Sequence, residues 1–197
     1  MPRPDVSVER KAQILEAALR VFDRQGFAQT RMKDIAAEAG LSVGILYHYF
    51  ADKESLLEAL LEHLFVTDLQ TTARAFQCGK SVRECLWEYF EQHLLAEMRF
   101  LNAGLELRAA AARHPHLRAR LLVFEKEYFD LLLSLIERGM SSGELRPAPP
   151  EIIALTLLSL YDGLLENLPR LLPESQEAAR RERIRQAFDL VFQGLLA

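Results

Sequence analysis

The segment Phe27–Lys53, FAQTRMKDIAAEAGLSVGILYHYFADK, decides the fold of this chain. Thr30 is a candidate N-cap, because its hydroxyl oxygen can accept a hydrogen bond from a backbone N–H in the first turn of a helix. Gly40 follows the short helix that this cap predicts, where a residue without a Cβ favours a tight turn. Ser42 is a second candidate cap, and Val43–Phe50 is a second short helix. Two short helices around a tight turn are typical of a helix-turn-helix, whose second helix enters the major groove of DNA.

Signature residues occur in and after this segment: Asp34-Ile35-Ala36, Ala39-Gly40-Leu41-Ser42, Leu46-Tyr47-His48-Tyr49-Phe50 and Asp52-Lys53-Glu54-Ser55-Leu56-Leu57. Together they resemble the DNA-binding signature of TetR-type (tetracycline-repressor-like) transcriptional regulators. A weaker likeness at residues 136–147 and 162–164 is similar to the C-terminal ligand-binding domains of one large branch of that family. The resemblance implies a helix-turn-helix DNA-binding domain at residues 1–53 and a helical ligand-binding and dimerisation domain at residues 54–197.

The composition of the 197 residues favours an all-α protein. Half of the residues are hydrophobic, Leu, Ala, Glu and Arg dominate, and β-branched residues are sparse. The formal net charge is −4, so the placement of Arg and Lys matters more for DNA binding than their total. The N-terminus lacks the apolar core of a signal peptide. The longest apolar run, Ile152–Leu165, is expected to be too short to span a bilayer and contains Asp162, so a cytoplasmic protein without membrane contact is predicted.

Apolar residues at helical spacing predict helices along the whole chain and no strands. Gly26 ends the first helix, and Asp52 and Ser81 are candidate N-caps of later ones. Pro169 is expected to end the helix before it. Outside the helix-turn-helix, the predicted helices span residues 8–25, 52–76, 81–100, 101–113, 117–140, 152–168 and 174–197.

The resemblance implies phosphate contacts at Thr30, Tyr47 and Lys53. Thr30 and Lys53 also lie at predicted helix N-termini, where the helix dipole favours an anion. Tyr47 has an alternative role as a core aromatic residue. As a phosphate contact, Lys53 should contribute about one unit to the slope of log affinity against log salt concentration.

Base contacts are expected from the second helix of the motif. His48 points into the major groove by this analogy, and Val43 and Gly44 approach the base edges. Arg31 can reach a base or a phosphate. The family often has Lys, Arg or Gln where Val43 stands, and Thr or Ser where Ile45 stands. Base reading is therefore expected through apolar contact of Val43 with thymine methyl groups, together with His48 and Arg31.

The C-terminal part carries many aromatic side chains with polar groups between them. The resemblance implies an inducer pocket here, and aromatic rings with carboxylates suit an organic cation. The alternative is that the aromatic rings are ordinary core and the acids are solvated. The candidate pocket residues are Trp87, Phe90, Phe100, Glu106, Phe124, Tyr128 and Asp162.

No feature of the sequence supports catalysis, a bound metal or a cofactor. The chain lacks a glycine-rich phosphate loop, and its serines lack the surroundings of a nucleophile elbow. His114 and His116 flank Pro115 without further metal ligands at a useful spacing, so a surface role is favoured over metal binding. Cys78 and Cys85 are two helical turns apart, too far for a disulfide, and reduced thiols are favoured over redox sensing.

The two C-terminal helices suggest how the chain associates with a second copy of itself. The helix at 152–168 is apolar nearly all round, and the helix at 174–197 carries a broad apolar stripe. The family solution is a homodimer in which these two helices form a four-helix bundle with those of the partner; the alternative is that they form the centre of a monomer. A two-fold dimer should bind a near-palindromic double-stranded DNA operator.

These observations predict a ligand-responsive transcriptional repressor that a small-molecule inducer releases from its operator. In this hypothesis the inducer favours a conformation in which the helix at 52–76 has shifted, so the recognition helices no longer match successive major grooves. Two alternatives stay open: an activator of the same fold, and a helical small-molecule-binding protein with a vestigial DNA motif. The sequence identifies neither the inducer nor the operator.

Overall fold

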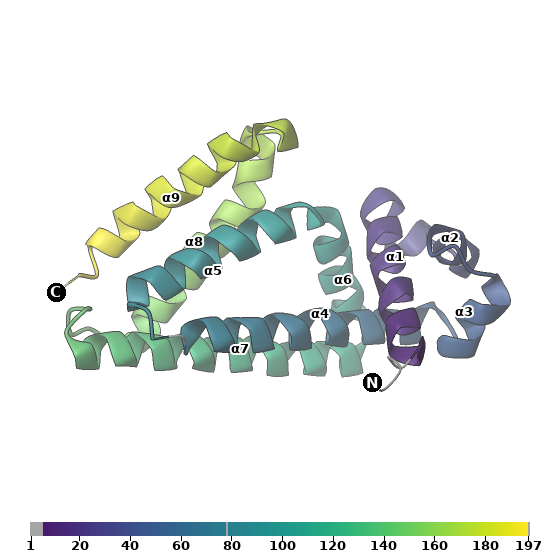
Figure 1. Cartoon of the computed structure of the whole chain (residues 1–197), viewed down its shortest axis with the longest axis horizontal. Coiled ribbons are helices and arrows are strands. Elements are labelled where there is room, and N and C mark those ends of the chain that lie inside the picture. The colour runs from purple at the N-terminus through teal and green to yellow at the C-terminus, as the bar shows by residue number, and fades with distance from the viewer. Residues whose placement is uncertain (1–5, 78, 197) are drawn as a thin grey trace. The chain divides into compact units, whose positions relative to one another are not determined.

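The computed structural model of the protein describes residues 6–77 and 79–196, and the thiol of Cys78 lies outside the described residues. Within those ranges the chain is helical without a named strand, which confirms the predicted all-α fold (Figure 1). The elements are α1 Val6–Gln29, α2 Met32–Glu38, α3 Val43–Tyr49, α4 Lys53–Phe76, α5 Val82–Met98, α6 Leu101–Arg113, α7 Pro115–Ser142, α8 Pro150–Leu171, the 3₁₀ turn η1 Glu174–Gln176 and α9 Glu177–Gln193.

The chain divides into two compact units. The first consists of the described residues up to Thr67 together with Phe100–Leu121, and the second of Asp68–Arg99 together with the described residues from Leu122 onward. Helices α4 and α7 contribute residues to both units. Helix α6 therefore belongs to the unit that holds the helix-turn-helix. The functional boundary expected after residue 53 stays a prediction.

The core of the first unit is built on the predicted face of α1. Phe27 leaves the helix and returns to this core, where its ring meets that of Phe22 edge-on at 5.3 Å. Helix α3 contributes one buried side chain, Leu46. Because apolar residues at helical spacing share one face, the same side chains that define the helices also bury them. The contributors from α1 are Ile14, Leu15, Ala17, Ala18, Val21 and Phe22, and those from α2 and α4 include Ile35, Ala36, Leu56, Leu57 and Leu60.

Gly26 interrupts α1, as predicted, with φ 77° and ψ 157°. The predicted cap at Thr30 is wrong: the N-cap of α2 is Arg31, which makes no side-chain cap bond. The Thr30 hydroxyl instead donates to the carbonyl of Gly26 at 2.7 Å, and Thr30 is buried. The reason is the kink, which takes this carbonyl out of the helical hydrogen-bond pattern and leaves it to Thr30. Asp34 accepts the Arg31 N–H at 3.0 Å in place of a cap.

The other three predicted N-caps are confirmed. Ser42 Oγ accepts the N–H of Ile45 at 3.3 Å, and Asp52 Oδ1 accepts the N–H of Ser55 at 2.7 Å. Hydrogen bonds from the backbone and hydroxyl of Ser55 lower the pKa of the Asp52 carboxyl. Ser81 and Glu84 form a reciprocal capping box at the start of α5, and hydrogen bonds from Ser81 lower the pKa of Glu84.

In the second unit, α5, α8 and α9 pack on one another, and phenylalanine rings meet between α5 and α9. Phe188 of α9 lies 5.4 Å from Phe90 of α5 and 5.3 Å from Phe192, measured between ring centroids. Helix α8 runs past Pro169 to Leu171, because a proline in the last turn removes one helical hydrogen bond without breaking the turns before it. Helix α9 begins after a 3₁₀ turn and ends at Gln193, short of the predicted end.

Part of the apolar surface of α8 and α9 is exposed. Ile152 and Leu155 on α8 are 59% and 57% exposed, and Leu190 on α9 is 76% exposed. At 22 residues, α8 is long and apolar enough to pass a length-and-composition test for a membrane span, so the expectation that this segment is too short is wrong. One such helix is weak evidence for a membrane protein, and α8 packs on α5 and α9 through its buried side chains.

Replacing Gly26 by alanine should destabilise the protein by about 1–2 kcal/mol, because an L-residue with a Cβ is strained at positive φ. A Cβ at this position would meet the Glu106 carboxylate at an ordinary 3.5 Å, so backbone strain rather than a clash is expected. Urea unfolding measures the change. Gly163→Ala in α8, where a Cβ meets nothing within 4 Å, is the control and should not destabilise. Equal stability of Gly26→Ala and the unchanged protein would contradict this interpretation.

Candidate DNA-reading surface and ligand site

Helix α3 exposes almost every side chain except Leu46. Val43 is 39%, Ile45 43% and Tyr47 51% exposed, and Gly44 and His48 are exposed as well. The alternative of Tyr47 as a core residue is therefore wrong, and the buried aromatic residue at this helix end is Phe50. Four of the seven predicted DNA-contacting residues are therefore exposed on α3, namely Val43, Gly44, Tyr47 and His48.

Polar and charged side chains of α1 hold α2 in place, and α3 packs against α2. Arg20 and Arg24 bind the two carboxylate oxygens of Glu38, with N···O distances of 2.8 and 2.6 Å. These hydrogen bonds, from Arg24 and then Arg20, lower the pKa of the Glu38 carboxyl. Gln13 Nε2 donates to the carbonyl of Ala39 at 2.7 Å. The C-terminal end of α2, and with it the turn into α3, is therefore held from α1 at two residues, Glu38 and Ala39.

The other three predicted DNA-contacting residues are Thr30, Arg31 and Lys53, and they differ in exposure and in hydrogen bonding. Arg31 is exposed at the start of α2. Thr30 is 3% exposed and bonded to Gly26, and Lys53 Nζ donates to the carbonyls of Phe27 at 2.6 Å and of Thr30 at 3.0 Å. Two of the three predicted phosphate contacts are thus engaged inside the protein. Their role on DNA stays a prediction.

The predicted pocket residues lie in several places. Phe90 and Tyr128 belong to a cluster of aromatic rings in the second unit, described next. Trp87 packs against Phe188 at 5.5 Å, Phe124 is buried, and Asp162 is exposed. Phe100 and Glu106 belong to the first unit. The lining of a ligand pocket by these residues stays a prediction.

Tyr89 is the centre of this tyrosine cluster, which we define as Tyr89, Tyr128, Tyr161 and Phe90 with the polar residues Asp68, Thr72 and His93. The ring of Tyr89 stacks on Tyr161 at 5.4 Å and lies 5.7 Å from Tyr128 and 4.7 Å from His93. The members come from α4, α5, α7 and α8. Tyr89 and Tyr161 were not among the predicted pocket residues. Tyr89 could have been included, because it lies beside Trp87 and Phe90 on the same helix and carries a hydroxyl group.

Hydrogen bonds connect the polar members. The Tyr128 hydroxyl donates to Asp68 Oδ2 at 2.8 Å, so the hydroxyl of Thr72, also at 2.8 Å, must donate to the oxygen of Tyr128. His93 Nδ1 lies 2.6 Å from Asp68 Oδ1. Thr72 is fully buried. Asp68 and Thr72 lie one turn apart on α4, so this network fastens α4 to α5 and α7.

Burial is the main reason that the pKa values of Tyr89, Tyr128 and Tyr161 lie well above the ordinary tyrosine value. All three are therefore neutral at physiological pH. Carboxylates raise the pKa of Tyr89 further, namely Glu97, Asp68 and Asp162. The hydroxyl of Tyr161 is buried without a hydrogen-bond partner, which is uncommon and costly. The cluster combines ring faces, negative charge and one unsatisfied hydroxyl, the features that recognise a cation carrying a hydrogen-bonding group.

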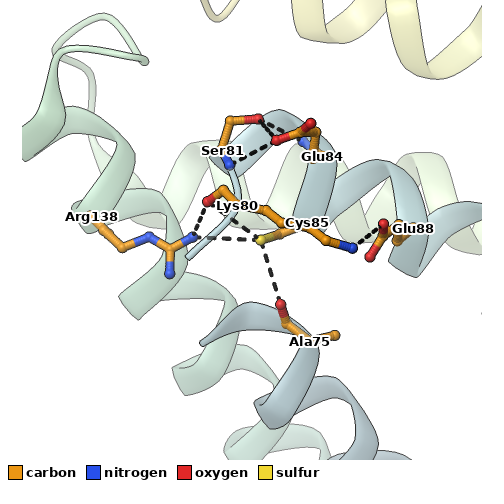
Figure 2. Close-up of polar contacts among 7 residues, drawn as sticks. All are labelled: Ala75, Lys80, Ser81, Glu84, Cys85, Glu88 and Arg138. Atoms are coloured by element: carbon orange, nitrogen blue, oxygen red, sulfur yellow. Dashed lines mark hydrogen bonds and ion pairs between the residues drawn. The ribbon is translucent and has the colours of Figure 1, made fainter. Parts of the chain in front are cut away.

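The C-terminal end of α4 is held by an arginine. Arg138 of α7 donates to the carbonyls of Phe76 and Lys80 and to the sulfur of Cys85, the last at 3.5 Å. Figure 2 shows the guanidinium facing Cys85 and Lys80, with the thiol directed toward the carbonyl of Ala75. Cys85 is fully buried, in agreement with a reduced thiol. Within the described residues, no three His, Cys, Asp or Glu side chains gather where they could hold a metal ion.

Comparison with known proteins gives two family matches that together span most of the chain. Residues 14–60 match the family of bacterial regulatory proteins called tetR, and residues 81–196 match the C-terminal domain of BetI-type transcriptional repressors. The transcriptional regulator YfiR of Bacillus subtilis is 31% identical over 173 residues, which cover 81% of this chain and 80% of that protein. The transcriptional regulator BetI of Paraburkholderia phytofirmans is 36% identical over 81 residues, 41% of this chain and 42% of BetI.

Solved structures share the fold. A transcriptional regulator from Saccharomonospora viridis in complex with choline superposes with a TM-score of 0.81 and 20% identity, over 96% of this chain and 99% of that one. The regulator FadR from Bacillus subtilis in complex with stearoyl-CoA gives a TM-score of 0.74 and 19% identity, over 91% and 96% of the chains. Members of this group are transcriptional regulators rather than enzymes. The chain belongs to the TetR family of bacterial transcriptional regulators.

Proposed function

We propose that the protein is a cytoplasmic repressor that binds a near-palindromic operator as a homodimer and leaves it when an organic cation binds the tyrosine cluster. The observation that carries the DNA part is the exposed α3 in a member of the TetR family. A repressor rather than an activator is favoured because the C-terminal match is to repressors. The alternative of a small-molecule-binding protein with a vestigial DNA motif is disfavoured. Val43, Ile45 and Tyr47 are exposed together on α3, and a contiguous exposed apolar patch marks an interaction site.

Base recognition on this proposal is mainly apolar. Helix α3 has no Lys or Arg, so Val43 and Ile45 meet thymine methyl groups and His48 supplies a hydrogen-bonding ring. Tyr47 and Arg31 contact the phosphates or base edges beside the helix. Because phosphate contacts fix the register and base contacts the sequence, the exposed α3 face needs both kinds of group.

The homodimer rests on the exposed apolar side chains of α8 and α9. Ile152, Leu155 and Leu190 are each more than half exposed, and in a monomer they would face water. A second copy of the chain supplies the same surface, which is the self-complementary arrangement of a two-fold interface. Two-fold symmetry then presents two copies of α3 to successive major grooves.

An organic cation fits the tyrosine cluster better than an anion does. The rings of Tyr89, Tyr128 and Tyr161 offer negative faces, and the carboxylate of Asp68 lies among them. An anion would meet the repulsion that already raises the pKa of Tyr89. The regulator from Saccharomonospora viridis shares the fold and binds choline, which supports a cation of this kind, while the bound stearoyl-CoA of FadR shows that the fold accommodates other ligands.

Helix α4 connects the two activities on this proposal. Asp68 and Thr72 lie on α4 and hold Tyr128 and His93. A cation that draws the Asp68 carboxylate toward itself weakens those bonds and favours a different position of α4. The ligand can release DNA only as far as its affinities for the two positions differ.

Selection of bound fragments from sheared DNA of the source genome, followed by titration at several salt concentrations, tests the DNA part. A near-palindromic site and a steep salt dependence are expected, with two chains per site. His48→Ala and Val43→Ala should each weaken the selected site by roughly 1–3 kcal/mol and leave binding to mixed-sequence DNA unchanged. Glu137→Ala, an exposed change on α7, is the control. Weak binding without sequence preference would contradict the proposal.

Calorimetry with choline as the probe tests the ligand part. Choline is expected to bind at least about tenfold more tightly than 3,3-dimethyl-1-butanol, its uncharged isostere, because cation–π attraction and the Asp68 carboxylate act on the charge alone. Asp68→Asn and Tyr89→Leu should each reduce this preference. Gln92→Ala, on an exposed position of α5, is the matched control. Equal affinity for the two probes, or binding of neither, would exclude a small quaternary ammonium ion as the ligand.

A further inference from the structure

Tyr161 of α8 carries a buried hydroxyl group that no other member of the tyrosine cluster binds. The residue is 5% exposed, and its hydroxyl is the one buried side-chain N or O atom without a hydrogen-bond partner among the residues that the structure describes. The ring lies 5.4 Å from that of Tyr89 and 5.7 Å from that of Phe90, so aromatic rings of α5 pack against it. A buried hydroxyl costs free energy unless a hydrogen bond satisfies it.

Tyr128 of α7 shows the opposite arrangement in the same cluster. Its hydroxyl donates to Asp68 at 2.8 Å and accepts from Thr72 at 2.8 Å, so both polar partners come from α4. The two phenols therefore differ in their hydrogen bonding, since α4 satisfies the hydroxyl of Tyr128 and not that of Tyr161. Because unsatisfied buried polar groups are rare in folded proteins, the hydroxyl of Tyr161 is a candidate for a functional role.

The surroundings of Tyr161 limit the chemical groups that its hydroxyl can bind. Burial first, and then the negative charge of Glu97, raise the pKa of Tyr161 well above its ordinary value, so the hydroxyl keeps its proton and can donate a hydrogen bond. Glu97 and Asp68, whose charges both act on Tyr161, would repel a carboxylate or phosphate acceptor. A neutral oxygen atom, such as that of a hydroxyl, ether or carbonyl group, meets no such repulsion.

We infer that Tyr161 is a specificity-determining residue of the tyrosine cluster, whose hydroxyl donates a hydrogen bond to a neutral oxygen atom of the bound organic cation. The inference rests on the proposed function, because it narrows the ligand of that same site. The ligand class becomes an organic cation that also carries a neutral hydrogen-bond acceptor. A site with a buried polar group discriminates strongly against an analogue that leaves this group unpaired, so a purely alkyl cation is disfavoured.

Calorimetry with choline and n-propyltrimethylammonium tests the inference, because the second cation keeps the charge and has a methyl group in place of the hydroxyl. The unchanged protein should bind choline about tenfold more tightly, as is typical of one hydrogen bond. Tyr161→Phe, which removes only the hydroxyl of the protein, should bring the two affinities within about twofold of each other. Tyr49→Phe, the matched removal of a hydroxyl in the first unit, should leave the preference for choline unchanged.

Thermal unfolding of the unliganded protein tests the same hydroxyl without a ligand. Tyr161→Phe should raise the melting temperature by about 4 °C, because it removes a buried polar group that has no partner. Tyr128→Phe should lower the melting temperature by about the same amount, because it breaks two hydrogen bonds. Since most substitutions of buried residues destabilise a protein, a rise for Tyr161→Phe is a specific outcome.

Equal affinity of the unchanged protein for the two cations, or a preference for choline that survives in Tyr161→Phe, would overturn the inference and leave the proposed cation site intact. A melting temperature that falls as far in Tyr161→Phe as in Tyr128→Phe would overturn it as well, because the hydroxyl would then have a partner inside the folded protein. Binding of neither cation would contradict the proposed function itself, and the inference with it.

Discussion

The positive φ of Gly26 is the constraint on which the DNA-binding unit depends. With φ at 77° the chain leaves the helical path, so Phe27 turns into the core and the carbonyl of Gly26 becomes available to Thr30. A residue with a Cβ pays a steric cost for this conformation, and glycine does not. The contacts at the start of α2 follow from the kink, including the bonds from Lys53 and Glu106 to the backbone of Phe27.

Helix α4 has polar anchors at both of its ends and in its middle. Lys53 binds the carbonyl of Phe27 at the N-terminal end, Asp68 and Thr72 bind Tyr128 along the helix, and Arg138 binds the carbonyl of Phe76 at the C-terminal end. Each anchor is a hydrogen bond to a charged or buried group, the kind whose loss changes stability most. A helix fixed in this way can transmit a change only if one anchor is released, and the Asp68 network is the anchor beside the aromatic rings.

Local features of the sequence predicted the elements and most of their ends. Ser42, Asp52 and Ser81 cap helices because the bond is made within one turn of chain, which a reader of the sequence can see. Thr30 fits the same local pattern but does not cap α2, because its hydroxyl binds the carbonyl of Gly26 instead. Capping rules use only the residues around one helix start, so they do not predict the effect of a kink earlier in the chain.

The tyrosine cluster was less predictable, for a different reason. Tyr89, Tyr128 and Tyr161 come from three helices, and their approach depends on packing that no spacing along the chain encodes. Aromatic residues were expected to line a site, and Phe90 and Tyr128 do belong to the cluster. Of the two acids predicted with them, Glu106 accepts the N–H of Phe27 in the first unit, and Asp162 is exposed on α8.

The carboxylate among the rings is Asp68, which lies on α4 and was not among the predicted pocket residues. The Asp68 carboxylate is partly buried, and Tyr128 and His93 are its partners. On the proposed function, Asp68 is the residue of the second unit at which a bound cation would compete with the hydrogen bonds that hold α4.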